Sequence, residues 1–394
     1  MTALIFWIML IWIFAVTYLL QPKICRRTLA DDGVYDYKAT VGFSVILFIV
    51  PLFFIAVRSG FVDTASYIGT FNNAPSDMSR FDEFVNRTDK SFLFYAFIMY
   101  FKNYISDNAQ WWIAAIAIFQ SVLVMYTFRK YSCDMGLSVF LFMASGIVCS
   151  WMCNGIRQFI AVAVIFACTQ LLIDKKWYFY IPVVLLMMGV LPITTRFGWA
   201  TPPWYLCGVH QSTLVMLLGC FFIQGKAFSN RVWILAAVFA VLVLTGGLDA
   251  ALDTSVENTT YVKDMEYVDA DTGTSWLRVM VESVPFVMAF VARKELKKEE
   301  LPPIIALSVN ASVITTVLYI ASAFTSGIYV GRLPIFTEMY NFILLPWLIK
   351  HPYKKYRQQF TIAMILGYLA YFYYQVNIVW ADSLYQSELL GINI

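Results

Sequence analysis

Residues 154–167 read NGIRQFIAVAVIFA, a polar opening that leads directly into a run of apolar side chains. Arg157 stands in that opening, and Asn154 and Gln158 lie beside it. A charged side chain at the centre of a bilayer costs about 2.5–3.5 kcal/mol on the insertion scale. The stretch therefore predicts a membrane helix that keeps a permanent charge at its mouth for a specific use.

Apolar runs of the same kind recur along the whole chain. Of its 394 residues, 60% are hydrophobic and 13% are charged, and the mean hydropathy is +0.68. A soluble domain has too little interior to hide so much apolar surface, whereas stretches of about 18 or more apolar residues form membrane-spanning helices. We therefore expect an all-α polytopic integral membrane protein in which residues 1–394 form a single transmembrane domain.

About twelve transmembrane helices are expected from the spacing of these runs. With this assignment, 18 of the 28 Lys and Arg residues fall on one side, which the positive-inside rule assigns to the cytoplasm, so both termini face outward. The first run lacks a basic n-region and a cleavage site, so we interpret it as a retained span and not as a signal peptide. The predicted spans lie near residues 3–20, 40–57, 110–128, 136–153, 155–173, 177–194, 206–224, 231–248, 276–292, 303–324, 332–349 and 360–380.

Two long loops are expected on the outer face, at residues 58–109 and 249–275. The first includes SFLFYAFIMYFKNYI at residues 91–105, which as a helix covers about 22 Å and is too short to cross comfortably. We interpret it as an interfacial or re-entrant helix, although the charge balance on the two sides does not decide this. Loops of this length in compact membrane proteins are usually functional.

Arginines gather at the predicted outer ends of the spans, namely Arg58, Arg157, Arg196, Arg278 and Arg332. Several guanidinium groups on one face of a bundle indicate an anionic ligand that the sequence itself does not provide. A diphosphate suits them, because a planar guanidinium group binds phosphate oxygens through two parallel hydrogen bonds. We expect these groups to meet in one extracytoplasmic cavity.

Each polar residue in this set also has a structural interpretation. Arg58 can extend its charge to lipid headgroups, and Arg278 can pair with Glu282 one helical turn away. Glu338 can form a hydrogen bond across the bundle, and His210 can be a buried histidine whose hydrogen bonds are satisfied. These alternatives stay open at the level of the sequence.

Several classes of site are not indicated. The chain contains no P-loop, GxSxG or HExxH motif and no set of acids and histidines with metal-ligand spacing, so we expect neither a cofactor nor a metal. Cys149 and Cys153 are one helical turn apart and are more typical of helix packing than of a disulfide. The net charge is only +3 and the basic residues are scattered, which argues against a nucleic-acid partner.

Four motifs, in this order, resemble those of the EpsG-type exopolysaccharide proteins, which belong to the wider Wzy group of polysaccharide polymerases. The order of the motifs and their alternation with spans match over residues 40–350. One departure is the stretch LPITTRFGWATPPWYL at residues 191–206, which delays the histidine motif. The motifs are RSGFVDTASYIGTF with Arg58, Asp63, Tyr67 and Phe71; NGIRQ with the later pair Lys175/Lys176; VHQSTLVML with His210 and Ser212; and GRLPIFTEMYNFILLP with Arg332.

The resemblance implies a GT-C-like helical bundle in the bacterial inner (cytoplasmic) membrane, with its active site facing the periplasm or the exterior. Such an enzyme joins oligosaccharide repeat units carried on undecaprenyl diphosphate, which serve as both donor and acceptor, into exopolysaccharide, capsule or O-antigen. It implies membrane lipid, a flippase and a chain-length regulator as partners. The glycosyl transfer is expected to be metal-independent.

Roles for individual residues follow from the residues and the resemblance together. The guanidinium groups would stabilise the charge on the leaving diphosphate, a base would accept the proton of the acceptor hydroxyl, and neutral groups would position the sugar and phosphate oxygens. His210 is slightly preferred over Asp63 as the base. The diphosphate ligands are Arg157, Arg332, Arg58 and Arg278, and the positioning residues are Tyr67, Asn154, Gln158 and Glu338.

Three other functions remain open. A flippase or exporter of lipid-linked oligosaccharide also needs an arginine-lined site, but it predicts charges through the span centres. A membrane O-acyltransferase that modifies the same polysaccharide needs a donor from the cytoplasm, where His351 is the only histidine expected. A glycan ligase differs from a polymerase only in its acceptor, and the sequence does not separate the two.

Overall fold

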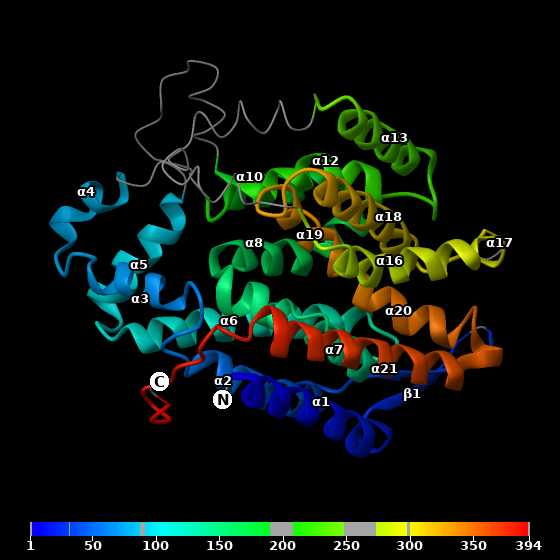
Figure 1. Ribbon diagram of the computed structural model, residues 1–394, viewed down its shortest axis with the longest axis horizontal. Coiled ribbons are helices and arrows are strands. Elements are labelled where there is room, and N and C mark those ends of the chain that lie inside the picture. The colour runs from blue at the N-terminus through cyan, green and yellow to red at the C-terminus, as the bar shows by residue number, and fades with distance from the viewer. Residues whose placement is uncertain are drawn as a thin grey trace. The chain divides into compact units, whose positions relative to one another are not determined.

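The computed structural model describes residues 2–30, 32–86, 91–189, 208–247, 273–297 and 300–392. Within these ranges the chain is mostly helical, which confirms the predicted fold class at the level of a helical protein (Figure 1). The chain groups into two compact units, Met1–Leu214 with Gln358–Ile394 and Val215–Arg357. The single transmembrane domain stays a prediction.

The first unit is built around long helices that pack along much of their length. Helix α1 packs against α2 and α7, α2 packs against α6, and α6 packs against α8. The elements are α1 (Thr2–Ile24), α2 (Val41–Ala56), α3 (Thr64–Asn72), η1 (Met78–Arg80), α4 (Phe81–Asn86), α5 (Phe92–Tyr104), α6 (Ala109–Tyr131), α7 (Met135–Ala144), η2 (Val148–Asn154), α8 (Ile156–Ala167), α9 (Thr169–Ile173), α10 (Trp177–Met188), η3 (Gln211–Leu214), α21 (Arg357–Tyr374) and η7 (Gln375–Val379).

A hairpin joins α1 to α2, and the sequence analysis did not predict it. Its strands are β1 (Arg26–Leu29) and β2 (Tyr35–Lys38), paired antiparallel with Arg26 opposite Lys38. The backbone N–H of Tyr37 donates to the Cys133 carbonyl at 2.9 Å, which attaches the hairpin to the segment before α7.

The predicted span at residues 136–153 is not one straight helix. Its two parts, α7 and η2, meet at an angle of 80°. The break contains Gly146 with φ +83°, a left-handed conformation that glycine adopts without steric cost. A Cβ atom at this position would lie 3.3 Å from the Gln375 side chain. The hydropathy of the segment gives no sign of this bend.

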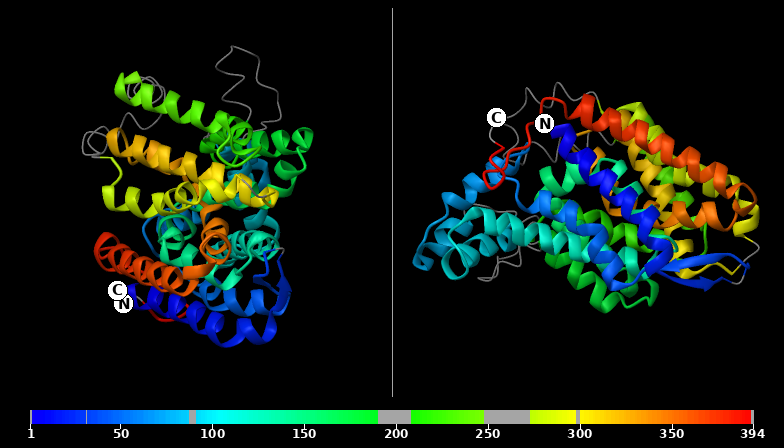
Figure 2. Two further views of the ribbon diagram at one scale, coloured as in Figure 1. Left: turned by 90° about the vertical axis from the view of Figure 1, so that its right-hand side faces the viewer. Right: turned by 90° about the horizontal axis from the view of Figure 1, so that it is seen from below.

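The ends of the first unit lie side by side in both views of Figure 2. The backbone N–H of Tyr385 donates to Thr2 Oγ1 at 2.8 Å, and the Tyr385 hydroxyl donates to the Phe54 carbonyl at 2.7 Å. Tyr385 therefore connects the C-terminal segment to the start of α1 and to the end of α2.

The second unit is organised around one buried helix, α18. Helices α12, α13, α16, α19 and α20 all pack against it. The Asn310 side chain donates to the carbonyls of Ile223 at 3.1 Å and Lys226 at 3.0 Å, and so holds the turn after α12. The elements are α12 (Val215–Ile223), α13 (Asn230–Leu244), α16 (Trp276–Val291), α17 (Arg293–Leu296), α18 (Pro303–Phe324), η5 (Val330–Arg332), α19 (Ile335–Glu338), α20 (Asn341–Lys350) and η6 (Lys354–Tyr356).

Membrane-spanning length is reached by fewer helices than the expected twelve. Four described helical stretches are long and apolar enough to cross a membrane, or five if α7 and η2 form one span. The four are Thr2–Ile24, Ala109–Tyr131, Pro303–Phe324 and Lys354–Val379. Apolar helices of 10–17 residues cover several other predicted spans, and the predicted span 332–349 is divided among η5, α19 and α20. Twelve crossings therefore stay a prediction, as does the interfacial position of the 13-residue α5.

Two segments of interest lie outside the described residues. They are the departure from the family pattern at 191–206, with Arg196, and the second long loop at 249–275 apart from its last three residues.

Candidate functional site

Arg58 lies in the turn that follows α2 and is buried, with only 1% of its surface exposed. Its Nε donates to Thr64 Oγ1 at 3.0 Å, its Nη2 donates to the Met152 carbonyl at 3.1 Å, and its Nη1 donates to the Ile55 carbonyl. Every guanidinium nitrogen therefore has a protein acceptor. This geometry differs from that of the expected phosphate ligand, because Arg58 ties α2, α3 and η2 together from the inside.

The turn from Ser59 to Asp63 is clamped by a segment from the other end of the unit. The backbone N–H of Ser59 donates to the Gln386 carbonyl at 2.8 Å, and the backbone N–H of Gln386 donates to the Gly60 carbonyl at 2.7 Å. Val62 has φ +46°, a conformation that is rare for a β-branched residue. The clamp maintains a strained turn directly before Asp63.

Asp63 stands at the N-terminus of α3, with its side chain exposed. Its backbone N–H donates to Asn154 Oδ1 at 3.3 Å, and Thr64 Oγ1 donates to the Cys153 carbonyl at 2.8 Å. These bonds join the start of α3 to the residues just before α8. Two predicted site residues, Asp63 and Asn154, are thus brought into contact although 91 positions separate them.

Arg157, in the first turn of α8, is half-buried and held by side chains from two other helices. Its Nη1 donates to Ser91 Oγ at 2.9 Å, and its guanidinium carbon lies 5.9 Å from the centre of the Phe94 ring. The Tyr67 hydroxyl is also within hydrogen-bond range of Arg157. The Tyr67 and Phe94 rings meet edge to face at 5.9 Å. Arg157 is the point where α3, α5 and α8 converge.

Tyr67 stays protonated in this setting. Burial raises the pKa of its phenol, and the nearby Arg157 charge opposes that shift only in part. Since an arginine can only donate, the Tyr67 oxygen accepts from Arg157 and its own proton can be donated elsewhere. Gln158, the next residue on α8, is buried, with 2% of its surface exposed.

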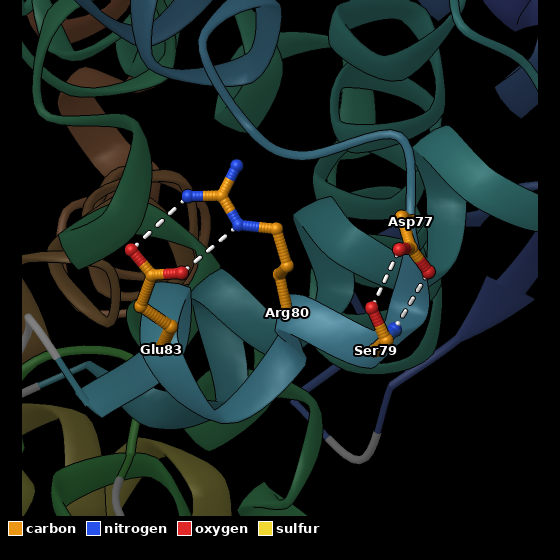
Figure 3. A network of polar contacts seen from close by, with 4 residues as sticks. All are labelled: Asp77, Ser79, Arg80 and Glu83. Carbon is orange, nitrogen blue, oxygen red and sulfur yellow. Dashed lines mark hydrogen bonds and ion pairs between the residues drawn. The ribbon is translucent and has the colours of Figure 1, made fainter.

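The predicted first loop also contains an arginine that is paired with a carboxylate (Figure 3). Arg80 Nε and Nη2 donate to the two oxygens of Glu83 at 2.9 and 3.1 Å, and both side chains are about half exposed. Asp77 accepts from the backbone N–H of Ser79 at 2.8 Å, and the hydrogen bonds to Ser79 hold the Asp77 pKa below its usual value. These contacts join residues that are close together in sequence.

His210 precedes η3, which packs against α8 and α10. Its Nδ1 lies 2.7 Å from Ser212 Oγ and accepts the Ser212 backbone N–H at 3.3 Å. A backbone N–H can only donate, so in the neutral ring Nδ1 is the acceptor and Nε2 carries the proton. The unprotonated nitrogen of His210 is thus turned toward its own segment, and the choice between His210 and Asp63 as the general base stays a prediction.

The second unit contains a separate polar group. Arg278 Nη2, on α16, donates to the Tyr319 hydroxyl at 2.9 Å, and that hydroxyl donates to Glu338 Oε2 at 2.5 Å. The alternative partner of Arg278, Glu282, accepts no hydrogen bond from it in the described part of the chain, although the Arg278 charge lies close enough to act on the Glu282 carboxyl. Arg332, in η5, is exposed.

The structure thus gathers the predicted residues in two places. Asp63, Tyr67, Asn154 and Arg157 meet in the first unit, and Glu338 and Arg278 meet in the second through Tyr319. The expectation of one shared cavity stays a prediction, because each group is described only within its own unit.

Some residues that contact the candidate site residues were not predicted from the sequence. Ser91 and Phe94, which hold Arg157, belong to a segment interpreted only as an aromatic interfacial helix. Tyr319 lies inside an apolar run, where a single sequence gives no sign of a polar role. Lys102 also escaped notice, although its Nζ donates to the carbonyls of Phe71 at 3.1 Å, Asn72 at 2.7 Å and Ala74 at 2.5 Å and so caps the end of α3.

Comparison with known proteins gives one family. The model of the EpsG family matches residues 41–190 and 206–386, which is most of the chain. Neither the curated proteins nor the solved structures include a match.

Proposed function

Because the chain belongs to the EpsG family, we propose that it polymerises undecaprenyl-diphosphate-linked oligosaccharide repeat units on the outer face of the bacterial cell membrane. Family membership and the long apolar helices support the general statement that it is a membrane protein with a role in exopolysaccharide polymerisation. The substrate, the orientation and the chemistry described next are the finer parts of the proposal.

The observation that carries the proposal is the setting of Arg157. A guanidinium group at the mouth of an apolar helix is fixed by Ser91 Oγ, the Phe94 ring and Tyr67. Hydrogen-bond donors that are oriented in advance stabilise developing negative charge without reorganising during the reaction. Arg157 is therefore suited to the diphosphate that leaves during glycosyl transfer. In the second unit, Arg278 and Arg332 keep the predicted role of diphosphate ligands.

In the proposed reaction the acceptor sugar hydroxyl attacks the anomeric carbon of the donor repeat. A new carbon–oxygen bond forms, and the bond to the diphosphate breaks and leaves its electrons on the phosphate oxygen. The hydroxyl proton passes to the base, for which His210 and Asp63 are the two candidates. Direct in-line attack inverts the anomeric centre, and the arginines supply the positive charge.

The remaining predicted residues position the substrate. Tyr67 donates its proton to a sugar or phosphate oxygen, and Asn154 and Gln158 flank Arg157 at the start of α8. Arg58 takes a structural role that maintains the turn carrying Asp63. A flippase is an expected partner because the repeats must reach the outer face. A chain-length regulator is expected because the length of the polysaccharide must be limited.

The test is polymerisation of purified lipid-linked repeats by Arg157 variants. Arg157→Ala should lower the rate by at least about a hundredfold, and Arg157→Lys should fall nearly as far because it keeps the charge but loses the planar fork. Arg80→Ala is the matched control, since this exposed arginine has its own carboxylate partner. Full activity of the alanine variant would end the assignment.

Cells that lack the protein distinguish the rival functions. A polymerase predicts single repeats accumulating on the lipid carrier at the outer face. A ligase predicts long chains still on lipid, a flippase predicts repeats retained at the inner face, and an O-acyltransferase predicts polymer of normal length without acyl groups. Mass analysis of lipid-linked glycans, with a sidedness assay, separates these outcomes.

A further inference from the structure

Two glutamates in the second unit are completely buried. Glu282 on α16 and Glu338 on α19 each have 0% exposed surface, and the two carboxyls are close enough to interact electrostatically. Among the described residues, the charged group beside them is Arg278, on the same helix as Glu282, and the neutral phenol of Tyr319 on α18 also contacts Glu338. Two full negative charges beside one half-buried guanidinium would leave an uncompensated charge in a low-dielectric interior, which is costly.

The hydrogen bonds show which carboxyl carries the negative charge. Glu338 Oε2 accepts the Tyr319 proton at 2.5 Å, and the same hydroxyl accepts from Arg278 Nη2 at 2.9 Å. A short bond from a polarised donor favours an ionised acceptor. Neither oxygen of Glu282 receives any hydrogen bond within the described residues, so ionising Glu282 has no comparable compensation.

We propose that this carboxyl pair carries one proton, held by Glu282, and that Tyr319 and ionised Glu338 are positioning residues for the Arg278 guanidinium. The inference rests on the proposed function in one respect, namely that Arg278 contacts the diphosphate. With one proton the cluster of Arg278, Glu282 and Glu338 is neutral, and without it the cluster is anionic and repels an anionic ligand. The Tyr319 hydroxyl donates to Glu338 and accepts from Arg278, so it fixes the direction of the guanidinium group.

The charge state is tested by infrared spectroscopy on the full-length protein in lipid or detergent. A protonated carboxylic acid gives a C=O stretching band distinct from that of a carboxylate, and ¹³C-glutamate labelling identifies it. We expect the wild type to show one such buried band, and Glu282→Gln to remove it. Glu338→Gln should remove it as well, because Glu282 then becomes the only carboxylate available to balance Arg278.

The other two charge states give different spectra. A pair with no proton shows no band in any of the three proteins, and a pair with two protons loses only half of the signal in each variant. Either spectrum overturns the inference. None of these spectra depends on the reaction that the protein catalyses.

The positioning role is tested by kinetics with lipid-linked repeats. Glu282→Gln keeps a neutral side chain of the same shape and should retain activity within about threefold. Tyr319→Phe breaks the link between Arg278 and Glu338 and should raise KM for the donor about tenfold with a smaller change in kcat, because it disturbs binding of the diphosphate. Equal activity of Tyr319→Phe and wild type would contradict the positioning role. Activity absent from every protein, with the expected spectra, would count against the proposed function and not against the charge state.

Discussion

The end of α2 and the start of α8 each present an arginine, and the two are used in opposite ways. Arg58 is buried, and its partners are Thr64 and two backbone carbonyls. Arg157 is half-buried, and its partners are a serine hydroxyl, a phenol and an aromatic face on neighbouring helices. The first arrangement holds helices together, and the second orients a charge. The type of partner, and not the presence of the arginine, separates scaffold from site.

The largest expected effect is on stability at the end of α2. Arg58→Ala leaves three acceptors in a buried region without their donor, and it should lower the free energy of unfolding by about 3 kcal/mol or more. Thermal unfolding in detergent, followed by tryptophan fluorescence, measures this loss. Arg157→Ala should lower the unfolding temperature far less. Equal shifts in the two variants would contradict the proposal that only Arg58 holds the helices together.

The next effect concerns the cap of α3, which carries Asp63 and Tyr67. Lys102→Met keeps the length of the side chain but removes all three donors from the carbonyls of Phe71, Asn72 and Ala74. We expect a loss of about 1.5–3 kcal/mol, the range for hydrogen bonds to a charged group. Hydrogen exchange should speed up in α3 before it does in α6, and uniform exchange would argue against a local cap.

A smaller effect is expected where Tyr67 and Ser91 hold Arg157. Tyr67→Phe and Ser91→Ala each remove one polar partner of the guanidinium and should reduce polymerisation by about threefold to tenfold, with little change in unfolding. The double variant should lose less than the product of the two single effects if both act through Arg157. Multiplicative losses would show that the two residues act independently.

The smallest effect is expected in the turn that directly follows Arg58. A Cβ atom on Gly60 would come within 2.3 Å of Gln386 Oε1, the far end of a flexible side chain that can move aside. Gly60→Ala should therefore cost only about 1 kcal/mol. Shortening the neighbour with Gln386→Ala should recover most of that loss in the double variant. No recovery would place the strain elsewhere in the turn.

Sequence reasoning recovered the helical nature of the fold, because apolar runs must form helices wherever backbone groups lie in lipid. It did not recover helix length or direction. The 80° bend at Gly146 and the division of residues 332–349 depend on backbone conformations that hydropathy does not register. The hairpin between α1 and α2 was not predicted because each of its strands is only four residues long.

The candidate site stays a prediction, but some of its residues are brought together by the fold. Motif spacing identified Asp63, Tyr67, Asn154 and Arg157, which the fold brings together across three helices. It could not separate Arg58 from Arg157, since both are arginines at the end of an apolar run. The role of Tyr319 depends on the orientation of one hydroxyl among helices distant in sequence, and a single sequence contains no information of that kind.

The pairing of Gly60 with Gln386 has a consequence for biogenesis. Gly60 emerges from the ribosome more than 300 residues before its partner, yet the strained turn that displays Asp63 is completed only when Gln386 arrives and the Ser387 hydroxyl reaches the Val57 carbonyl, 330 positions away. Most helices can insert into the membrane during synthesis, but the turn at Gly60 cannot be completed until Gln386 has been synthesised. A partly translated chain therefore stays in an immature form, and its turn before Asp63 is completed only after residues 386 and 387 have been made.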